Sequence, residues 1–139
     1  MSSTYDATFT AGPEHIDQLG HVNNAIWVQW MEVIAAAHWQ RDARPADVAA
    51  YVWVVVRHEI DYHGNIQQGE SVEAQTFITE APTGARFVRN IRFRNSAGKN
   101  IVTAKTTWAM INAATGRLAR IPPEVAAPFL PPSPSEASH

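Results

Sequence analysis

The sequence has 139 residues, of which 45% are apolar, and a formal net charge of -2, as expected for one globular domain. It has no cysteine, which excludes disulfides, a thiol nucleophile and a cysteine-ligated metal site. The nearly balanced charge and the lack of any apolar stretch of about 20 residues argue against nucleic-acid and membrane partners. No basic and apolar leader is present, so we expect a cytoplasmic protein, and nothing in the composition calls for a cofactor.

The N-terminal third predicts a strand, a loop and one long helix. Residues 5–9 alternate weakly in polarity, which is typical of a strand, and a Gly-Pro pair ends it. A loop over residues 14–22 follows. Either Asn23 or Asn24 then caps a helix that runs to about Trp39, because an asparagine side chain accepts from the first free amides of a helix.

The sequence predicts that this helix is buried on most sides. Only Glu32 is charged between Asn24 and His38. One apolar face is formed by residues spaced three and four apart, namely Trp27, Trp30, Met31 and Ile34. Because a helix that is apolar all round lies inside a protein, a curved sheet must surround it in a chain of this size.

The remainder of the chain predicts strands joined by turns, after a loop or short turn that ends at Ala50. These strand segments are rich in β-branched and aromatic residues, and Gly, Pro or Asn separates them. The predicted strands are residues 51–62, 70–80, 85–94 and 100–111. A short edge strand over residues 117–121 and a final short helix from Pro122 are also expected. Residues 128–139, rich in Pro and Ser, predict a disordered tail.

Together these elements predict one α+β domain over residues 1–127. A long central helix is wrapped by a curved antiparallel β-sheet of five to six strands.

The densest cluster of polar residues lies directly before the buried helix, over residues 15–24. The first amides of a helix are free donors at the positive end of its dipole, so a substrate carbonyl placed there is polarised. Asp17 lies a few residues upstream, where it can attack such a carbonyl or activate a water. Gly20 allows the backbone to approach closely. An ordinary loop aspartate accounts for the same position.

The neighbours of Asp17 have two readings each. His21 either orients Asp17 or a water, or is a structural loop histidine. Asn23 and Asn24 either bind a substrate oxygen or simply cap the helix, and the two roles are compatible.

The strands contain weaker candidates. His58 lies near Glu59, but adjacent strand residues point to opposite faces, so we expect no metal site there. Glu73 is a rival catalytic carboxylate on a polar face. Four arginines share the segment 85–94, and alternation places Arg89 opposite the other three; they form either a solvated face or a contact with phosphates. The three are Arg86, Arg92 and Arg94.

The segment Asp17-Gln18-Leu19-Gly20-His21-Val22-Asn23-Asn24-Ala25, followed by a helix with Trp27 and Glu32, resembles the signature of hot-dog acyl-CoA thioesterases of the 4-hydroxybenzoyl-CoA thioesterase type. Shorter matches over residues 56–62, 106–108 and 115–117 follow in the same order. The resemblance extends over about residues 5–121. It implies the hot-dog fold and a homodimer, often paired into a homotetramer, with active sites at the dimer interface.

The resemblance also implies an activity, the hydrolysis of an acyl-CoA thioester to a free acid and CoA. In it Asp17 is the nucleophile or general base, and amides at or beside Asn24 polarise the carbonyl. From its position beside them we expect His21 to be the third catalytic residue. No metal is implied. The remaining candidates are assigned to substrate binding: Gly20, Asn23, Trp27, His58, Arg86 and Arg89. A non-catalytic module that binds acyl-CoA or an acyl-carrier protein is the alternative.

Overall fold

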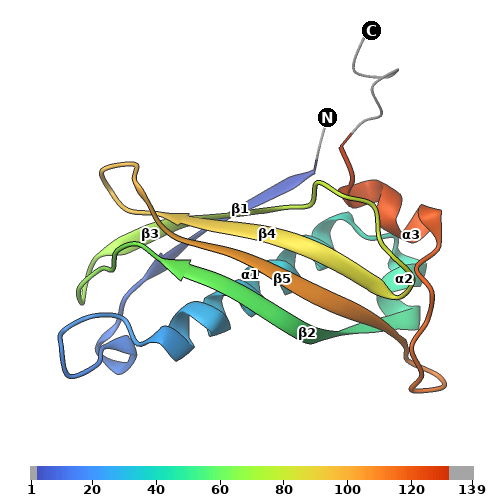
Figure 1. Cartoon of the computed structure of the whole chain (residues 1–139), viewed down its shortest axis with the longest axis horizontal. Coiled ribbons are helices and arrows are strands. Elements are labelled where there is room, and N and C mark those ends of the chain that lie inside the picture. The colour runs from blue at the N-terminus through green and yellow to red at the C-terminus, as the bar shows by residue number, and fades with distance from the viewer. Residues whose placement is uncertain (1–2, 132–139) are drawn as a thin grey trace, which may run out of the picture.

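The computed structural model describes residues 3–131, which form one antiparallel sheet curved around a long helix (Figure 1). The sheet has five strands in the order β1-β3-β4-β5-β2. Their bounds are Thr4–Thr10 for β1, Tyr51–Tyr62 for β2, Ser71–Phe77 for β3, Arg86–Arg94 for β4 and Asn100–Asn112 for β5. The predicted α+β architecture is confirmed, with five strands at the lower end of the expected range.

The long helix, α1, spans Asn24–Asp42 and begins where an asparagine was expected to cap it. The side chain of Asn23 accepts a hydrogen bond from the amide of Ala25 at 2.9 Å, which satisfies one free donor of the first turn. The helix continues three residues beyond Trp39 and ends before Pro45, since the residue that precedes a proline is driven out of the helical region.

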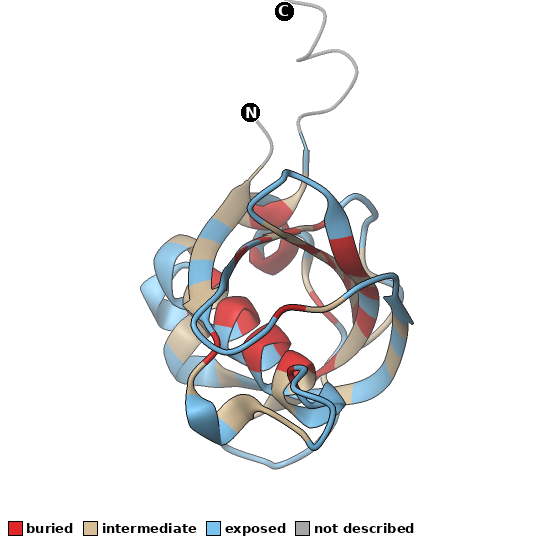
Figure 2. Ribbon diagram, turned by 90° about the vertical axis from the view of Figure 1, so that its left-hand side faces the viewer, coloured by how far each residue is buried: buried red, intermediate tan, exposed pale blue. Residues whose placement is uncertain are grey.

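Only one side of α1 is buried in the chain. The buried residues face the sheet, and they are Trp27, Trp30, Met31, Ile34, Ala35 and His38. The opposite side is open in Figure 2, and Val33 there is 56% exposed. The prediction that α1 is buried on most sides is therefore wrong for a single chain, because one curved sheet covers only one face of a helix.

The edge strand β2 changes its pairing register between Val55 and Arg57. This bulge reverses which residues of the strand face α1. Tyr51 and Trp53 face inward before the bulge, and His58 faces inward after it. On the outward side, three valines are each about half exposed, at positions Val52, Val54 and Val56.

Three smaller predictions need correction. Residues Pro45–Ala50 form a helix, α2, where a loop or short turn was expected, because proline fits the first helical turn and Arg44 pairs with Asp47 at 2.8 Å. Residues 117–121 form no strand and contribute only an isolated bridge from Leu118 to Ile111.

The expected C-terminal helix is present, as α3 at Pro123–Ala126. A short 3₁₀ helix at Ala127–Phe129 follows it, and Phe129 is only 1% exposed. The disordered tail therefore does not start at residue 128, because Phe129 anchors the chain in the core. The rest of that prediction, residues 132–139, lies outside the described residues. Among the helices described, none is long and apolar enough to cross a membrane.

Candidate active site

Asp17 lies in a tight turn whose conformation its own carboxylate fixes. Gly20 has a φ of +79°, a backbone conformation that favours glycine, and its amide donates to the carbonyl of Asp17 at 3.1 Å. Oδ1 of Asp17 accepts from the amides of Leu19 at 2.9 Å and His21 at 3.1 Å. Within residues 3–131, Oδ2 of the half-buried Asp17 accepts no hydrogen bond, so one carboxylate oxygen is held and the other is available.

The loop of Asp17 folds back on the start of α1. Ile16 and Val22 form an antiparallel bridge. The amide of Asn23, which is the cap residue, donates to the carbonyl of His15 at 2.9 Å. The turn at Asp17 is therefore the tip of a small hairpin whose base includes the cap residue of the helix.

Within residues 3–131, the start of α1 leaves the amide of Asn24 free. Asn23 occupies two donors of the first turn: its side chain accepts from Ala25, and its carbonyl accepts from Ile26 at 2.9 Å. The amide of Asn24 has no acceptor among the residues that the structure describes. It is a free donor at the positive end of the helix dipole.

His21 contributes its backbone rather than its imidazole. Its side chain is exposed, and its hydrogen bonds with Asp17 both use its backbone: its amide donates to Oδ1, and its carbonyl accepts from the amide of Asp17 at 2.8 Å. The reading in which the His21 side chain orients Asp17 therefore has no support from the geometry of this chain.

Asn65 fixes the loop from the other side, and the sequence reasoning missed it. Its Oδ1 accepts from the amide of Val22 at 3.1 Å, and its Nδ2 donates to the carbonyl of Val22 at 3.2 Å. Val22 is 1% exposed. The only signal in the sequence was an asparagine in the break after a strand, which is commonplace in turns.

The other predicted binding residues are dispersed. Trp27 is 0% exposed and packs edge-on against Phe93, with ring centroids 5.0 Å apart, so its assignment to substrate binding is replaced by a role in the core. Nδ1 of the half-buried His58 is 2.8 Å from Oγ1 of Thr106. No cluster of potential metal ligands occurs between residues 3 and 131.

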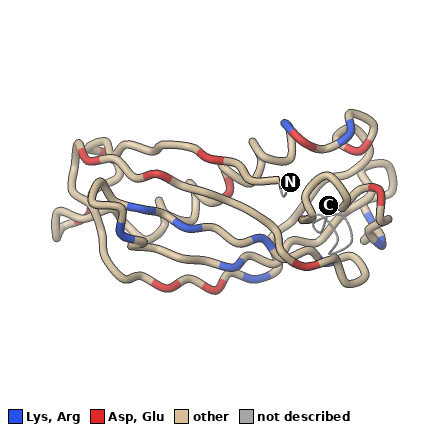
Figure 3. Tube along the Cα trace, turned by 90° about the horizontal axis from the view of Figure 1, so that it is seen from above, with Lys and Arg blue, Asp and Glu red and all other residues tan. Residues whose placement is uncertain are grey.

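The arginines of β4 separate as the alternation predicted. Arg86 is exposed, whereas Arg89 is 6% exposed on the face toward α1. Both signs of charge are spread over the sheet (Figure 3), since the inner strand β3 carries Glu73 and the edge strand β2 carries Arg57. The solvated-face interpretation fails for Arg89, because its side chain lies inside the molecule.

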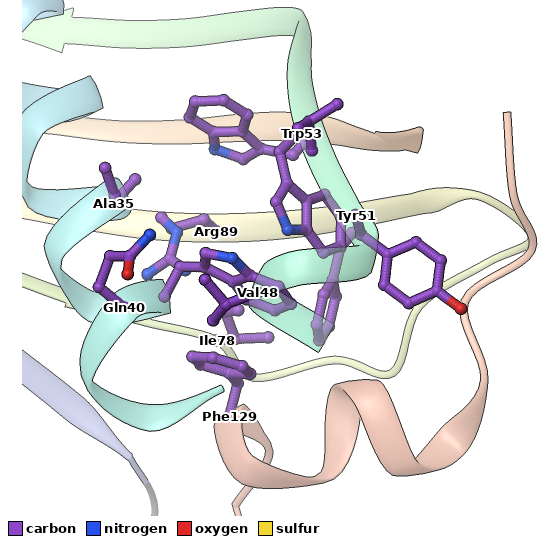
Figure 4. Close-up of a pocket in the computed structure, with 13 residues that line it drawn as sticks. Ala35, Gln40, Val48, Tyr51, Trp53, Ile78, Arg89 and Phe129 are labelled. Carbon is purple, nitrogen blue, oxygen red and sulfur yellow. The ribbon is translucent and has the colours of Figure 1, made fainter. Parts of the chain in front are cut away.

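A cavity of about 270 Å³ lies at the far end of α1 (Figure 4). Its walls are largely aromatic, from Trp39, Tyr51, Trp53, Phe87, Trp108 and Phe129. Arg89 projects into it from β4, and Gln40 lies opposite on α1. At 1.5 Å per residue, this part of α1 is about 20 Å from Asn24, so the cavity and the loop of Asp17 are separate in one chain.

Arg89 is the first member of a buried polar chain. Its Nη1 donates to Nδ1 of His38 at 2.7 Å and to Oγ1 of Thr76 at 3.0 Å. Since arginine only donates, His38 accepts at Nδ1 and carries its proton on Nε2, which lies 2.5 Å from Oγ of Ser3. Ser3 in turn donates to Asp42.

Burial and hydrogen bonding set the charges of the groups in this polar chain. Burial lowers the pKa of His38 to about 4, helped by the charge of Arg89, so His38 is neutral at pH 7. Burial also lowers the pKa of Arg89 to about 10, which leaves Arg89 charged. Hydrogen bonds from Arg41 and Ser3 hold the pKa of Asp42 well below its usual range, although partial burial opposes them.

A helix wrapped by a curved antiparallel sheet, with an aspartate turn at the helix start, defines a hot-dog domain, so the expected fold is confirmed. The chain belongs to the thioesterase-like superfamily, whose family model matches residues 11–129.

Similar proteins carry related descriptions. A chloroplastic acyl-(acyl-carrier-protein) hydrolase of Cuphea viscosissima is 28% identical over 80 residues, which are 58% of this chain but only 19% of that protein. The crystal structure of an acyl-ACP thioesterase from Bacteroides thetaiotaomicron aligns with 26% identity and a TM-score of 0.75, over 85% of this chain and 49% of that one. A thioesterase from Thermus thermophilus, complexed with coenzyme A and zinc, aligns with 21% identity and a TM-score of 0.76 over 90% of each chain.

Proposed function

We propose that this protein hydrolyses an acyl-CoA thioester to a free acid and CoA. The observation that carries the proposal is the presence of two unsatisfied groups at the start of α1, namely Oδ2 of Asp17 in the hairpin and the amide of Asn24 directly after it. One is a carboxylate oxygen that can attack or take a proton, and the other is a donor that can stabilise an oxyanion. The coenzyme A bound to the Thermus thermophilus relative supports CoA as the thiol.

The proposed reaction uses these groups in sequence. The thioester oxygen lies on the amide of Asn24, where the negative charge of the tetrahedral intermediate is stabilised. Asp17 acts either as the nucleophile, forming an anhydride that water then cleaves, or as the general base for an attacking water. In both versions the carbon–sulfur bond breaks and the thiolate of CoA leaves and takes up a proton.

We further propose that two copies build each site, by pairing of their β2 strands. β2 is a twelve-residue edge strand, and an unpaired edge of this length is a template for a second strand. The half-exposed row of Val52, Val54 and Val56 gives it apolar surface to bury. A homodimer formed in this way leaves open its pairing into a homotetramer.

The same pairing brings the start of α1 in one copy close to the end of α1 in the other copy. A two-fold axis perpendicular to the sheet makes the β2 strands antiparallel, so the start of one lies beside the end of the other. The cavity is lined by Tyr51 and Trp53 at the start of β2. Asn65, just beyond the end of β2, holds the loop of Asp17 through Val22. Each proposed site therefore combines Asp17 of one copy with the cavity of its partner.

The test is release of free thiol from a panel of short, long, branched and aromatic acyl-CoAs. Asp17→Asn keeps Oδ1, and therefore the turn, but replaces the free oxygen by an amide. We expect it to reduce kcat by about 10²- to 10⁴-fold with an unchanged melting temperature. Equal rates for variant and wild type would overturn the role of Asp17. No turnover of any thioester by the wild type would favour the binding-module alternative.

A further inference from the structure

Arg89 is a buried cation that contacts no anion among residues 3–131. It is 6% exposed, and burying a guanidinium is costly unless a carboxylate compensates its charge. Its hydrogen-bond partners within residues 3–131 are His38 and Thr76, neither of which is an anion. Three other arginines, Arg41, Arg44 and Arg57, each pair with an aspartate or glutamate within 2.8 Å.

The nearest acid in the polar chain does not serve as the missing counter-ion. Asp42 lies on the other side of His38, 3.2 Å from its Nε2, so the imidazole ring separates it from Arg89. Asp42 is already paired with Arg41 at 2.7 Å. In the part of the chain that the structure describes, no carboxylate in contact with Arg89 therefore compensates its positive charge.

The unused donors of Arg89 belong to the aromatic cavity. Only Nη1 has acceptors in the described part of the chain, which leaves the N–H groups of Nε and Nη2 without partners there. The cavity thus offers apolar walls and one positive charge that has unpaired donors.

We infer that this cavity binds the acyl part of the substrate and selects small acyl groups that end in a carboxylate, which Arg89 holds in a charge-assisted hydrogen bond. The inference rests on the proposed thioester hydrolysis. A carboxylate accepts from the donors that the cavity leaves unused, and the aromatic walls enclose the apolar part of the acyl group. The substrate class is the monothioester of a dicarboxylic acid.

The size of the cavity limits the acyl group. Its volume, about 270 Å³, is slightly below the range of about 300–1,000 Å³ that drug-sized ligands occupy. A short aliphatic or single-ring acid fits this volume better than a long fatty chain does.

The experiment compares thioesters that differ only in the terminal group. Glutaryl-CoA is paired with pentanoyl-CoA, and 4-carboxybenzoyl-CoA with 4-methylbenzoyl-CoA. For the wild type we expect kcat/KM to be about 10- to 100-fold higher for the carboxylate in at least one pair. Arg89→Met should abolish this preference. Lys105→Met, which removes an exposed positive charge from the outer face of β5, should keep it.

A binding measurement separates this inference from the proposed function. Tryptophan fluorescence reports on the cavity, since three tryptophans line it. We expect saturable quenching by 4-methylbenzoate and about 10- to 100-fold weaker binding of the neutral 4-methylbenzamide. Turnover without a carboxylate preference would overturn the inference and leave the hydrolase proposal standing. Carboxylate binding without any turnover would support the carboxylate site and overturn the hydrolase proposal.

The wild-type comparisons need no variant, so the inference remains testable if Arg89→Met does not fold. In that case Arg89→Lys, which keeps the charge, should retain part of the preference. Wild type that treats both members of each pair alike, in turnover and in binding, would refute the inference.

Discussion

The loop before α1 and the cavity at its far end differ in how their polar groups are held. In the loop, Asp17 is fixed by backbone amides two and four residues away, and it remains half-buried. In the cavity, Arg89 is fixed by side chains from α1 and β3 and is almost entirely buried. The reactive groups thus come from a local motif, whereas the recognition group depends on the assembled core.

After substitution of Asp17, the largest loss of activity should come from removing the free backbone amide of Asn24. Asn24→Pro deletes this N–H at the first helical position, where proline is well tolerated, and the extended backbone of Asn23 suits a residue before proline. We expect kcat to fall by about 10²- to 10³-fold without loss of helix content. Asn24→Ala, which keeps the amide, is the control. An equal fall of kcat in both variants would show that the side chain of Asn24, and not its amide, is needed for the reaction.

At the cavity end, the expected effect is a dependence of the unfolding free energy on pH, caused by His38. The pKa of His38 falls from 6.5 in the unfolded chain to about 4 in the folded one, so the unfolded chain binds the extra proton between these values. Stability from this group is complete above pH 6.5 and is lost as pH falls toward 4, by about 3 kcal/mol.

Urea unfolding of wild type and His38→Gln between pH 4 and 7 measures this loss. The difference in unfolding free energy between the two proteins should shrink as pH falls through this window. Because the pKa of Asp42 is depressed below its usual value of 3.8, its own contribution declines only at lower pH. A difference independent of pH would show that His38 does not titrate in this way.

A smaller loss of stability is expected at Asn65, which holds the loop of Asp17 through Val22. Asn65→Ala leaves the amide and carbonyl of the buried Val22 without partners, at a cost of about 2 kcal/mol in unfolding free energy. Denaturant titration measures this loss, and kcat should decline as the loop of Asp17 loses its support. An unchanged kcat with reduced stability would confine Asn65 to folding.

The sequence predicted the loop end of the molecule well because its determinants are local. Apolar spacing and the cap at Asn23 act within a few residues, so the long helix and the loop before it followed from pattern alone. The strand segments were placed to within about three residues at their ends for the same reason.

The cavity end was not predictable in the same way. His38 and Arg89 are 51 positions apart, and only the register of β4 and the rotation of α1 bring them together. Alternation placed Arg89 on the opposite face from its neighbours but gave no indication that this face is the interior. The burial of Phe129 was missed because composition indicated a polar tail.

The measurement that most directly tests the joint use of both ends is complementation between two inactive variants. Asp17→Asn removes the reactive group, and Gln40→Trp fills the cavity from an exposed position of its lining. If each site combines Asp17 of one copy with the cavity of its partner, a mixed dimer holds one intact site. After equal amounts are unfolded and refolded together, thiol release should reach about a quarter of the wild-type rate, because half the dimers are mixed. Activity no higher than the average of the two separate variants would contradict the shared site.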